Sequence, residues 1–107
     1  MTAEEIFEDE VKAIKKDRRA VVLTIYDITD DKRRLRMVKC LERFGVRVQK
    51  SAFEAFLDKE RYERMKDEAS RLIDENEDSL RIYVLRDPLA VRTWGRGDAH
   101  TEDVIII

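Results

Sequence analysis

The chain has 107 residues, of which 43% are apolar and 43% are charged, and it contains three glycines and one proline. This length allows one domain with a modest core, and the composition excludes a disordered chain, a collagen-like chain and a two-domain enzyme. The net charge of −2 is not that of a typical nucleic-acid-binding protein, so any basic surface must be local.

Residues 2–16 are predicted to form an amphipathic helix within an N-terminal extension, residues 1–19. Thr2 and Glu5 have the spacing of a capping box. The predicted apolar face consists of Phe7, Val11 and Ile14. Residues 1–10 contain five acidic residues and no basic ones, unlike a secretory signal peptide. Because no apolar run reaches the roughly 18 residues of a membrane helix, we expect a cytoplasmic protein without membrane contact.

The next elements follow from apolar patterning and turn residues. Residues 20–28 are nearly continuous in apolar and β-branched side chains, which predicts a central strand buried on both faces. Thr29 or Asp30 can cap a helix over residues 31–44. Gly45 is placed to end that helix in the left-handed conformation.

The rest of the chain completes a domain over residues 20–107. The apolar phase changes at Lys50–Ser51, which predicts a bulge or bend in an extended region. The remaining predicted elements are extended chain over 46–57, a helix over 59–75 capped by Asp58, a strand over 79–86 and a final apolar strand over 103–107. From residue 20 the order is β-α-β-β-α-β, which predicts an α+β, ferredoxin-like sandwich with two helices on one face of an antiparallel sheet.

Charge is distributed unevenly along the predicted domain. Residues 30–50 contain eight basic and three acidic residues, whereas residues 54–78 contain ten acidic and five basic residues. A folded chain with this pattern can present one basic face that binds nucleic acid without sequence preference. The alternative is a set of solvated helix faces with ion pairs four residues apart.

Asp27 is the main candidate for chemistry. The single cysteine, Cys40, and the single histidine, His100, exclude a disulfide framework and a His/Cys zinc site within one chain. A carboxylate at a strand end, beside an arginine-rich helix N-terminus, suits a metal-held phosphate. The alternative is that Asp27 pairs with Arg34 or caps the helix. One carboxylate is a poor magnesium site unless symmetry supplies a second.

Two aromatic residues, Phe53 and Tyr83, could stack on nucleic-acid bases. Aromatic side chains on a sheet face covered by helices are more often part of the core, and we expect this for both.

Five sequence blocks carry a resemblance to a known family. They are YDI at 26–28, DDKRR at 30–34, FGVRVQKSAFE at 44–54, DSLRIYVL at 78–85 and DVIII at 103–107. From Ala20 to Ile107 the sequence resembles the small CRISPR-associated protein of the spacer-acquisition machinery, the second universal adaptation protein, often named as an endoribonuclease. The resemblance leaves residues 1–19 unexplained.

The resemblance implies a homodimer that bridges CRISPR integrase subunits and binds duplex DNA. It also implies an endonuclease for single-stranded RNA or double-stranded DNA that depends on Mg²⁺, with Mn²⁺ as a substitute, although some relatives act as non-catalytic scaffolds. Asp27 would be the catalytic and metal-binding residue. The residues expected to bind nucleic acid, most of them at positions that relatives place near this aspartate, are Tyr26, Arg33, Arg34, Arg36, Arg47 and Phe53. A dimer would also double Asp27, and the strand at 103–107 would reach the partner's sheet.

Overall fold

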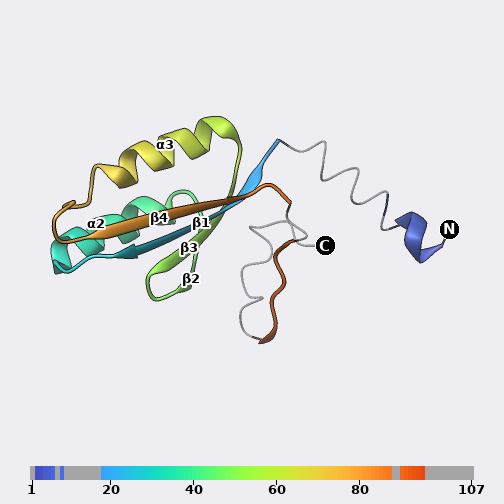
Figure 1. Cartoon of the computed structure of the whole chain (residues 1–107), viewed down its shortest axis with the longest axis horizontal. Coiled ribbons are helices and arrows are strands. Elements are labelled where there is room, and N and C mark those ends of the chain that lie inside the picture. Colours follow the sequence, from blue (N-terminus) through green and yellow to red (C-terminus); the bar gives the residue numbers. More distant parts are fainter. Residues whose placement is uncertain (1, 7, 9–17, 88–89, 96–107) are drawn as a thin grey trace.

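The computed structural model describes residues 2–6, 8, 18–87 and 90–95, and its main part is a two-layer α+β unit. Two helices cover one face of a four-stranded antiparallel sheet with strand order β2-β3-β1-β4 (Figure 1). The elements are β1 (Ala20–Asp27), α2 (Asp31–Glu42), β2 (Val46–Gln49), β3 (Ala52–Leu57), α3 (Lys59–Ser70) and β4 (Ser79–Leu85). This order and topology confirm the ferredoxin-like arrangement.

Both helices begin at the predicted caps. The Asp30 carboxylate accepts a hydrogen bond from the backbone N–H of Arg33 at 2.9 Å, and this bond lowers the pKa of Asp30. The Asp58 carboxylate accepts one from the N–H of Arg61, also at 2.9 Å. Each cap satisfies a donor that would otherwise be unpaired at a helix N-terminus. Asp30, rather than Thr29, therefore starts α2.

The helices end earlier than predicted. α2 stops at Glu42 instead of residue 44, and α3 stops at Ser70 instead of residue 75. After α3 the chain must turn back towards β4, and the turn is held by backbone N–H bonds to Asp78 and Asp74. Leu72 and Ile73 still pack against the core from outside the helix.

The prediction for Gly45 was wrong. Among the described residues, Gly95 is the glycine with a positive φ, at 71°. Gly45 is needed for space instead, because a Cβ there would lie 2.1 Å from the carbonyl oxygen of Glu54 and 2.7 Å from the Cβ of Ala55. The turn between α2 and β2 thus passes directly against β3.

The predicted break at Lys50–Ser51 is the turn of a hairpin between β2 and β3. The register of this hairpin shifts between Arg47 and Gln49, which leaves one extra residue in β2. The change of apolar phase in the sequence therefore marks both the turn and the irregularity beside it.

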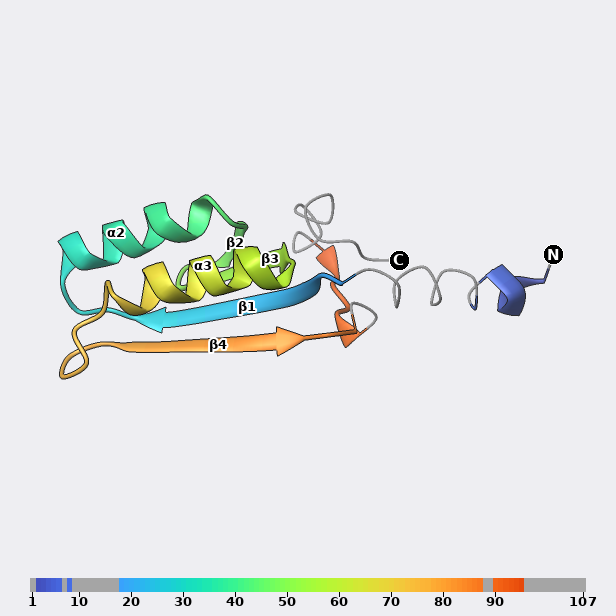
Figure 2. The ribbon, with the colours of Figure 1, turned by 90° about the horizontal axis from the view of Figure 1, so that it is seen from above.

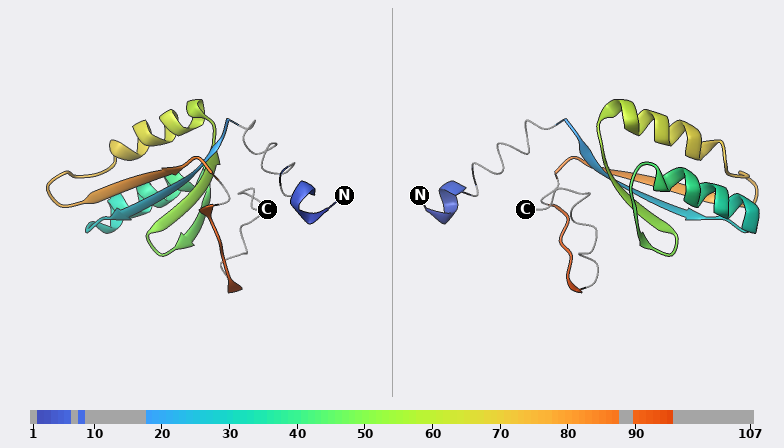
Figure 3. Two further views of the ribbon diagram at one scale, coloured as in Figure 1. Left: turned by 45° about the vertical axis from the view of Figure 1, so that its right-hand side comes forward. Right: turned by 180° about the vertical axis from the view of Figure 1, so that it is seen from behind.

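The sheet has one covered and one open face. Figure 3 shows both helices on the same side of the sheet. The core between the layers is formed mainly by Val22, Tyr26, Met37, Leu41, Phe53, Leu57 and Met65. On the opposite face of β1, Ile25 is 38% exposed and Asp27 is exposed. β1 is central in the sheet, as predicted. The prediction that both of its faces are buried holds on the open side only at Val21, because no second layer of described residues covers the other side chains of β1 on that side.

The N-terminal extension is described only in part. Residues 3–6 are helical, and the N–H of Glu5 donates to Thr2 Oγ1 at 3.2 Å, as expected for a capping box. The rest of the predicted helix over 2–16, apart from residue 8, and the predicted strand over 103–107 lie outside the described residues. Within the described part of the chain, no helix has the length and apolarity needed to cross a membrane.

Candidate functional site

Asp27 lies at the end of β1 on the open face of the sheet. Its backbone is paired with Ser79, the first residue of β4, and its side chain is exposed. Paired residues of antiparallel strands point to the same face, and side chains alternate along each strand. The open face of β4 next to Asp27 therefore carries Ser79, Arg81 and Tyr83.

Arg81 and Tyr83 were not predicted as site residues. The Arg81 guanidinium donates to the Tyr83 hydroxyl at 3.2 Å, and Tyr83 is 43% exposed. The expectation that Tyr83 belongs to the core was wrong, because Tyr83 alternates with Ile82 and Val84, which point to the helical side. Reading the period-two alternation of residues 79–85 from Leu80 would have placed both on the open face.

Tyr26 lies on the opposite, covered face and is 2% exposed. Its ring packs beside Phe53 with centroids 6.4 Å apart, and its hydroxyl donates to the carbonyl oxygen of Lys50 at 3.4 Å. Burial raises the pKa of Tyr26. Phe53 is also 2% exposed, so neither ring is available to stack on a base, contrary to their expected direct contact with nucleic acid. Both rings hold the β2–β3 turn against the end of β1.

Arg34 and Arg47 flank Tyr26, and their positive charges oppose the effect of burial on its pKa. Arg34 donates to the carbonyl oxygen of Ile28 at 3.0 Å and forms an ion pair with Asp31. Arg47 donates from Nε to the carbonyl oxygen of Lys50 at 3.1 Å. Among the ion pairs between described residues, Arg34 pairs with Asp31 rather than with Asp27.

Arg33 lies one residue before Arg34 and is engaged within the chain. Its guanidinium contacts Asp78 at 2.8 Å and Glu77 at 3.0 Å, and its side chain is 23% exposed. The hydrogen bond from Arg33 lowers the pKa of Asp78 to about 2. This placement favours a structural role for Arg33 over the expected contact with nucleic acid.

Arg36 lies on the outer side of the helical layer, away from Tyr26. It lines a cavity of about 520 Å³ together with Lys39, Cys40, Arg43, Glu68, Arg71 and Leu72. Arg43 forms an ion pair with Glu68 across the two helices. The remaining basic side chains leave this outer groove positively charged, so it can attract a phosphate backbone.

The predicted site residues therefore separate into four places. Arg34, Arg47, Tyr26 and Phe53 gather on the covered side, and Arg36 lies in the outer groove. Arg33 is paired with the connection before β4, and Asp27 lies on the open face. Within the described residues, no three His, Cys, Asp or Glu side chains lie close enough together to hold a metal ion. Among the described residues on the open face of the sheet, Asp27 is the exposed carboxylate, and Arg81 lies on the same face.

Comparisons with known proteins agree on one family. The model of the family described as CRISPR associated protein Cas2 matches residues 20–92. A CRISPR-associated endoribonuclease Cas2 of Chloroflexus aurantiacus is 44% identical over 68 residues, which are 64% of this chain and 73% of that protein. A second one, of Thermus thermophilus, is 39% identical over 80 residues, or 75% of this chain and 85% of that protein.

Solved structures are similar to this chain as well. The structure of Streptococcus pyogenes Cas2 has a TM-score of 0.58 and 32% sequence identity, and the similarity covers 70% of this chain and 99% of that one. A hypothetical protein from Thermus thermophilus has a TM-score of 0.60 and 40% identity, covering 63% of this chain and 82% of that one.

Proposed function

Because the chain belongs to the CRISPR-associated Cas2 family, we propose that it is an endonuclease that hydrolyses phosphodiester bonds in single-stranded RNA or double-stranded DNA. The observation that carries this proposal is the exposed Asp27 carboxylate at the end of β1, on an otherwise largely apolar face of the sheet. Asp27 forms no ion pair with another described residue, so its carboxylate is available to a bound metal ion.

A homodimer would complete the site. The open face exposes Ile25 and Tyr83 and lacks a second layer of described residues, and an apolar sheet face of this kind requires a partner. A second copy packed face to face by a two-fold axis would bring two Asp27 carboxylates towards each other. The proposed catalytic unit is therefore a dimer with one carboxylate from each subunit.

The donor set of that dimer suits Mg²⁺, with Mn²⁺ as a substitute. Mg²⁺ prefers oxygen ligands and is commonly bound by one or two carboxylates, waters and substrate phosphates. The two Asp27 side chains would hold the ion. When bound, it supplies a water of lowered pKa and polarises the phosphoryl oxygens. A single chain supplies one carboxylate at this point, and the dimer would supply two.

Arg81 is the described cation best placed to assist on the same face. Its guanidinium is held by Tyr83 on the strand next to Asp27, where it can neutralise charge on a bound phosphate. In the proposed hydrolysis, water forms the new bond to phosphorus, the bond to the leaving sugar oxygen breaks, and that oxygen takes up a proton.

A cleavage assay with a matched carboxylate control tests the proposal. Wild type, Asp27→Asn and Glu75→Gln would be incubated with labelled RNA and duplex DNA in Mg²⁺, in Mn²⁺ and with EDTA. We expect cleavage by wild type and Glu75→Gln, and its loss in Asp27→Asn and with EDTA. Glu75 is an exposed carboxylate outside the sheet, so it controls for loss of charge alone. Equal cleavage by all three proteins would contradict the role of Asp27.

The dimer is tested separately by light scattering. Tyr83→Asp places a charge on the open face and should yield a monomer that does not cleave nucleic acid. Leu35→Asp changes an exposed apolar residue of α2, which is 54% exposed, and should leave the dimer intact. A dimeric Tyr83→Asp protein would exclude this face as the interface.

The alternative function is a non-catalytic, DNA-bridging subunit of the CRISPR integrase. The positively charged outer groove around Arg36 favours it, because this groove can bind a duplex without the open face. If the wild type binds duplex DNA and an integrase subunit but cleaves neither RNA nor DNA in Mg²⁺ or Mn²⁺, the alternative holds and the nuclease proposal fails.

A further inference from the structure

Two groups of opposite charge lie near each other on the open face of the sheet without pairing. Asp27 is opposite Ser79 in the register of β1 and β4, and Arg81 is opposite Ile25, the next pair on this face. Figure 2 shows the two strands side by side along their length. Diagonal neighbours of this kind are about 7–8 Å apart, within reach of a long side chain. Arg81 could therefore reach Asp27, yet none of the ion pairs between described residues joins these two.

The hydroxyl of Tyr83 holds the Arg81 guanidinium instead. Arg81 Nη1 donates a hydrogen bond to this oxygen at 3.2 Å. Tyr83 lies two residues beyond Arg81, about 7 Å along the strand, on the side away from Asp27. The hydrogen bond therefore draws the cation away from the carboxylate.

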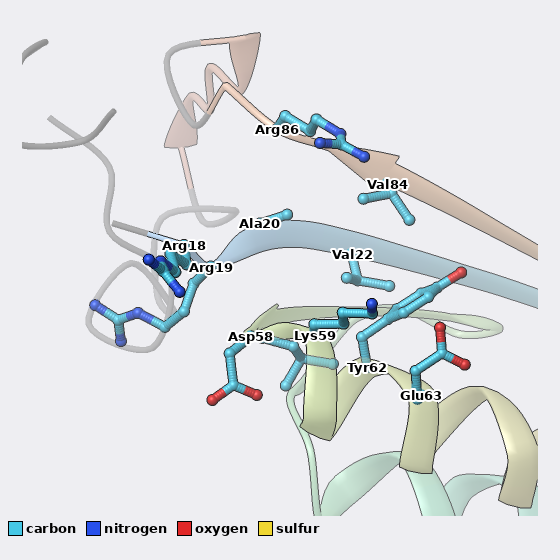
Figure 4. Close-up of a pocket in the computed structure, with 11 residues that line it drawn as sticks. Arg18, Arg19, Ala20, Val22, Asp58, Lys59, Tyr62, Glu63, Val84 and Arg86 are labelled. Carbon is cyan, nitrogen blue, oxygen red and sulfur yellow. The ribbon is translucent and has the colours of Figure 1, made fainter. Parts of the chain in front are cut away.

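A cavity on the other face of the sheet supports this placement of the side chains. It has a volume of about 760 Å³, and Val84 of β4 and Tyr62 of α3 are among the residues that line it (Figure 4). Because Val84 faces the helical layer there, its neighbour Tyr83 faces the open side. Tyr83 therefore shares the open face with Arg81 and Asp27, whereas Tyr62 lies on the helical side.

The separation of Arg81 from Asp27 contrasts with the arginines elsewhere in the described chain. Several of these are paired with carboxylates, and the pairs include Arg33–Asp78, Arg34–Asp31 and Arg43–Glu68. Glu54, the other carboxylate of the open face, lies farther from Arg81 than Asp27 does, because β1 separates β3 from β4. The hydrogen bond to Tyr83 accounts for the different behaviour of Arg81.

The chemical character of this hydrogen-bond partner matters. A tyrosine hydroxyl is neutral, so accepting a hydrogen bond from Arg81 leaves the positive charge of the guanidinium uncompensated and its other donors available. A carboxylate in the same position would neutralise that charge. Among the described residues, the open face thus carries an anion at Asp27 and a cation at Arg81, neither in an ion pair. These are the charges that attract a metal ion and a phosphate, respectively.

We propose that Tyr83 is a positioning residue, which holds Arg81 away from Asp27 and so keeps the Asp27 carboxylate available to the metal ion. This inference rests on the metal-binding role of Asp27 proposed above. Without the Tyr83 hydroxyl, the Arg81 guanidinium would move to its diagonal neighbour. There it would occupy the carboxylate oxygens of Asp27 and repel a divalent cation.

Metal binding measures this effect without relying on cleavage. Mn²⁺ would be titrated, with electron paramagnetic resonance as the readout, into wild type, Asp27→Asn, Tyr83→Phe, Arg81→Gln and the double variant Tyr83→Phe/Arg81→Gln. Tyr83→Phe removes only the hydroxyl and keeps the ring on the open face, and light scattering would verify that each variant has the oligomeric state of the wild type. Tyr62→Phe is the matched control, because it removes a tyrosine hydroxyl on the helical side.

The expected losses of affinity differ between the variants. Asp27→Asn should bind Mn²⁺ much more weakly than wild type. Tyr83→Phe should bind it about threefold to fivefold more weakly, which is the effect of one ion pair at a protein surface. Adding Arg81→Gln to Tyr83→Phe should remove this loss, because glutamine forms no ion pair with Asp27. Tyr62→Phe should bind Mn²⁺ as wild type does.

The outcomes separate this inference from the proposed function. Equal affinities of wild type and Asp27→Asn would contradict the metal site and overturn both. If wild type binds Mn²⁺ through Asp27 but Tyr83→Phe binds it equally well, the metal site stands and the positioning role is overturned. A double variant as weak as Tyr83→Phe would also overturn that role, because the loss would then not come from Arg81.

The Mg²⁺ dependence of cleavage gives a second readout. In Tyr83→Phe the Mg²⁺ concentration for half-maximal cleavage should rise by the same factor as the loss of Mn²⁺ affinity, because the metal ion must displace Arg81 from Asp27. The rate at saturating Mg²⁺ should approach that of wild type. A lower rate at saturating Mg²⁺, with no change in the concentration required, would contradict the proposal.

Discussion

Arg33 and Asp78 join the start of α2 to the connection that leads into β4. The Arg33 Nε lies 2.8 Å from Asp78 Oδ2, and Nη2 lies 3.2 Å from Oδ1, so the two groups form a bidentate pair. The Asp78 side chain has no exposed surface and also accepts hydrogen bonds from the backbone N–H groups of Thr29 and Asp74. This carboxylate thus ties together three separate stretches of chain.

Replacing Arg33 should destabilise the fold. Arg33→Ala would leave the covered Asp78 charge without its cation, and we expect the Tm to fall by several degrees in thermal unfolding followed by circular dichroism. Arg64→Ala is the matched control, since Arg64 pairs with Glu60 on the exposed side of α3 at 3.5 Å, and it should change the Tm very little. Equal Tm values for the two variants would refute a structural role for Arg33.

The same pair should make stability depend on pH below 4. The pKa of Asp78 falls from its usual 3.8 to about 2 in the folded chain. Because folding lowers this pKa, the ionised carboxylate contributes its full stabilisation above about pH 3.8, and the contribution disappears as the pH falls through 2. Urea midpoints should therefore differ between wild type and Asp78→Asn at neutral pH and converge towards pH 2. Parallel curves across this range would argue against the assignment.

Gly45 should tolerate no side chain. A Cβ at this position would meet backbone and side-chain atoms of β3 at 2.1–2.8 Å, so we expect Gly45→Ala to lose roughly 3 kcal/mol in urea unfolding. Gly95 provides a contrast, because it has a φ of 71° but a Cβ added there would have no atom within 4 Å. Gly95→Ala should cost only the backbone strain, roughly 1 kcal/mol. Reversed costs would contradict the close approach of the turn before β2 to β3.

Binding to nucleic acid should be electrostatic and should depend on the outer groove. Arg36→Ala and Lys39→Ala are each expected to weaken binding to duplexes of any sequence. Each should also reduce the slope of log affinity against log salt by up to about 0.9 for every phosphate that is no longer neutralised. Fluorescence anisotropy at several salt concentrations measures both quantities, with Arg64→Ala as the control. A slope that stays at the wild-type value, or a weakening confined to one sequence, would rule out this groove as the binding surface.

The fold followed from local signals in the sequence. The caps Asp30 and Asp58, the apolar run of β1 and the phase change at Lys50–Ser51 each act within a few residues. The structure confirms the caps, the central position of β1 and the bend, although one face of β1 is largely uncovered. The element order then left few alternatives for how the strands pair. The helix ends were less predictable, because the turn that follows α3 is held by a hydrogen bond from the N–H of Asp74 to Asp78, which lies later in the chain.

The site was harder to predict because it depends on which way each side chain points. Tyr26 and Asp27 are adjacent in the sequence, and the resemblance placed them together, but strand alternation sends them to opposite faces of the sheet. Arg33 finds its partner at Asp78, 45 residues away, which no local pattern indicates. The period-two alternation of β4, in contrast, does predict that Arg81 and Tyr83 lie on the open face of the sheet.

The single thiol of the protein lies between the two helices. Cys40 is 6% exposed, forms part of the wall of the outer groove, and its pKa is raised by burial. A protonated and covered thiol reacts slowly, so a thiol reagent can reach it mainly when α2 and α3 separate. The rate at which a thiol reagent labels Cys40 therefore measures how often the helical layer opens. It can be measured in the unmodified protein, with and without bound nucleic acid.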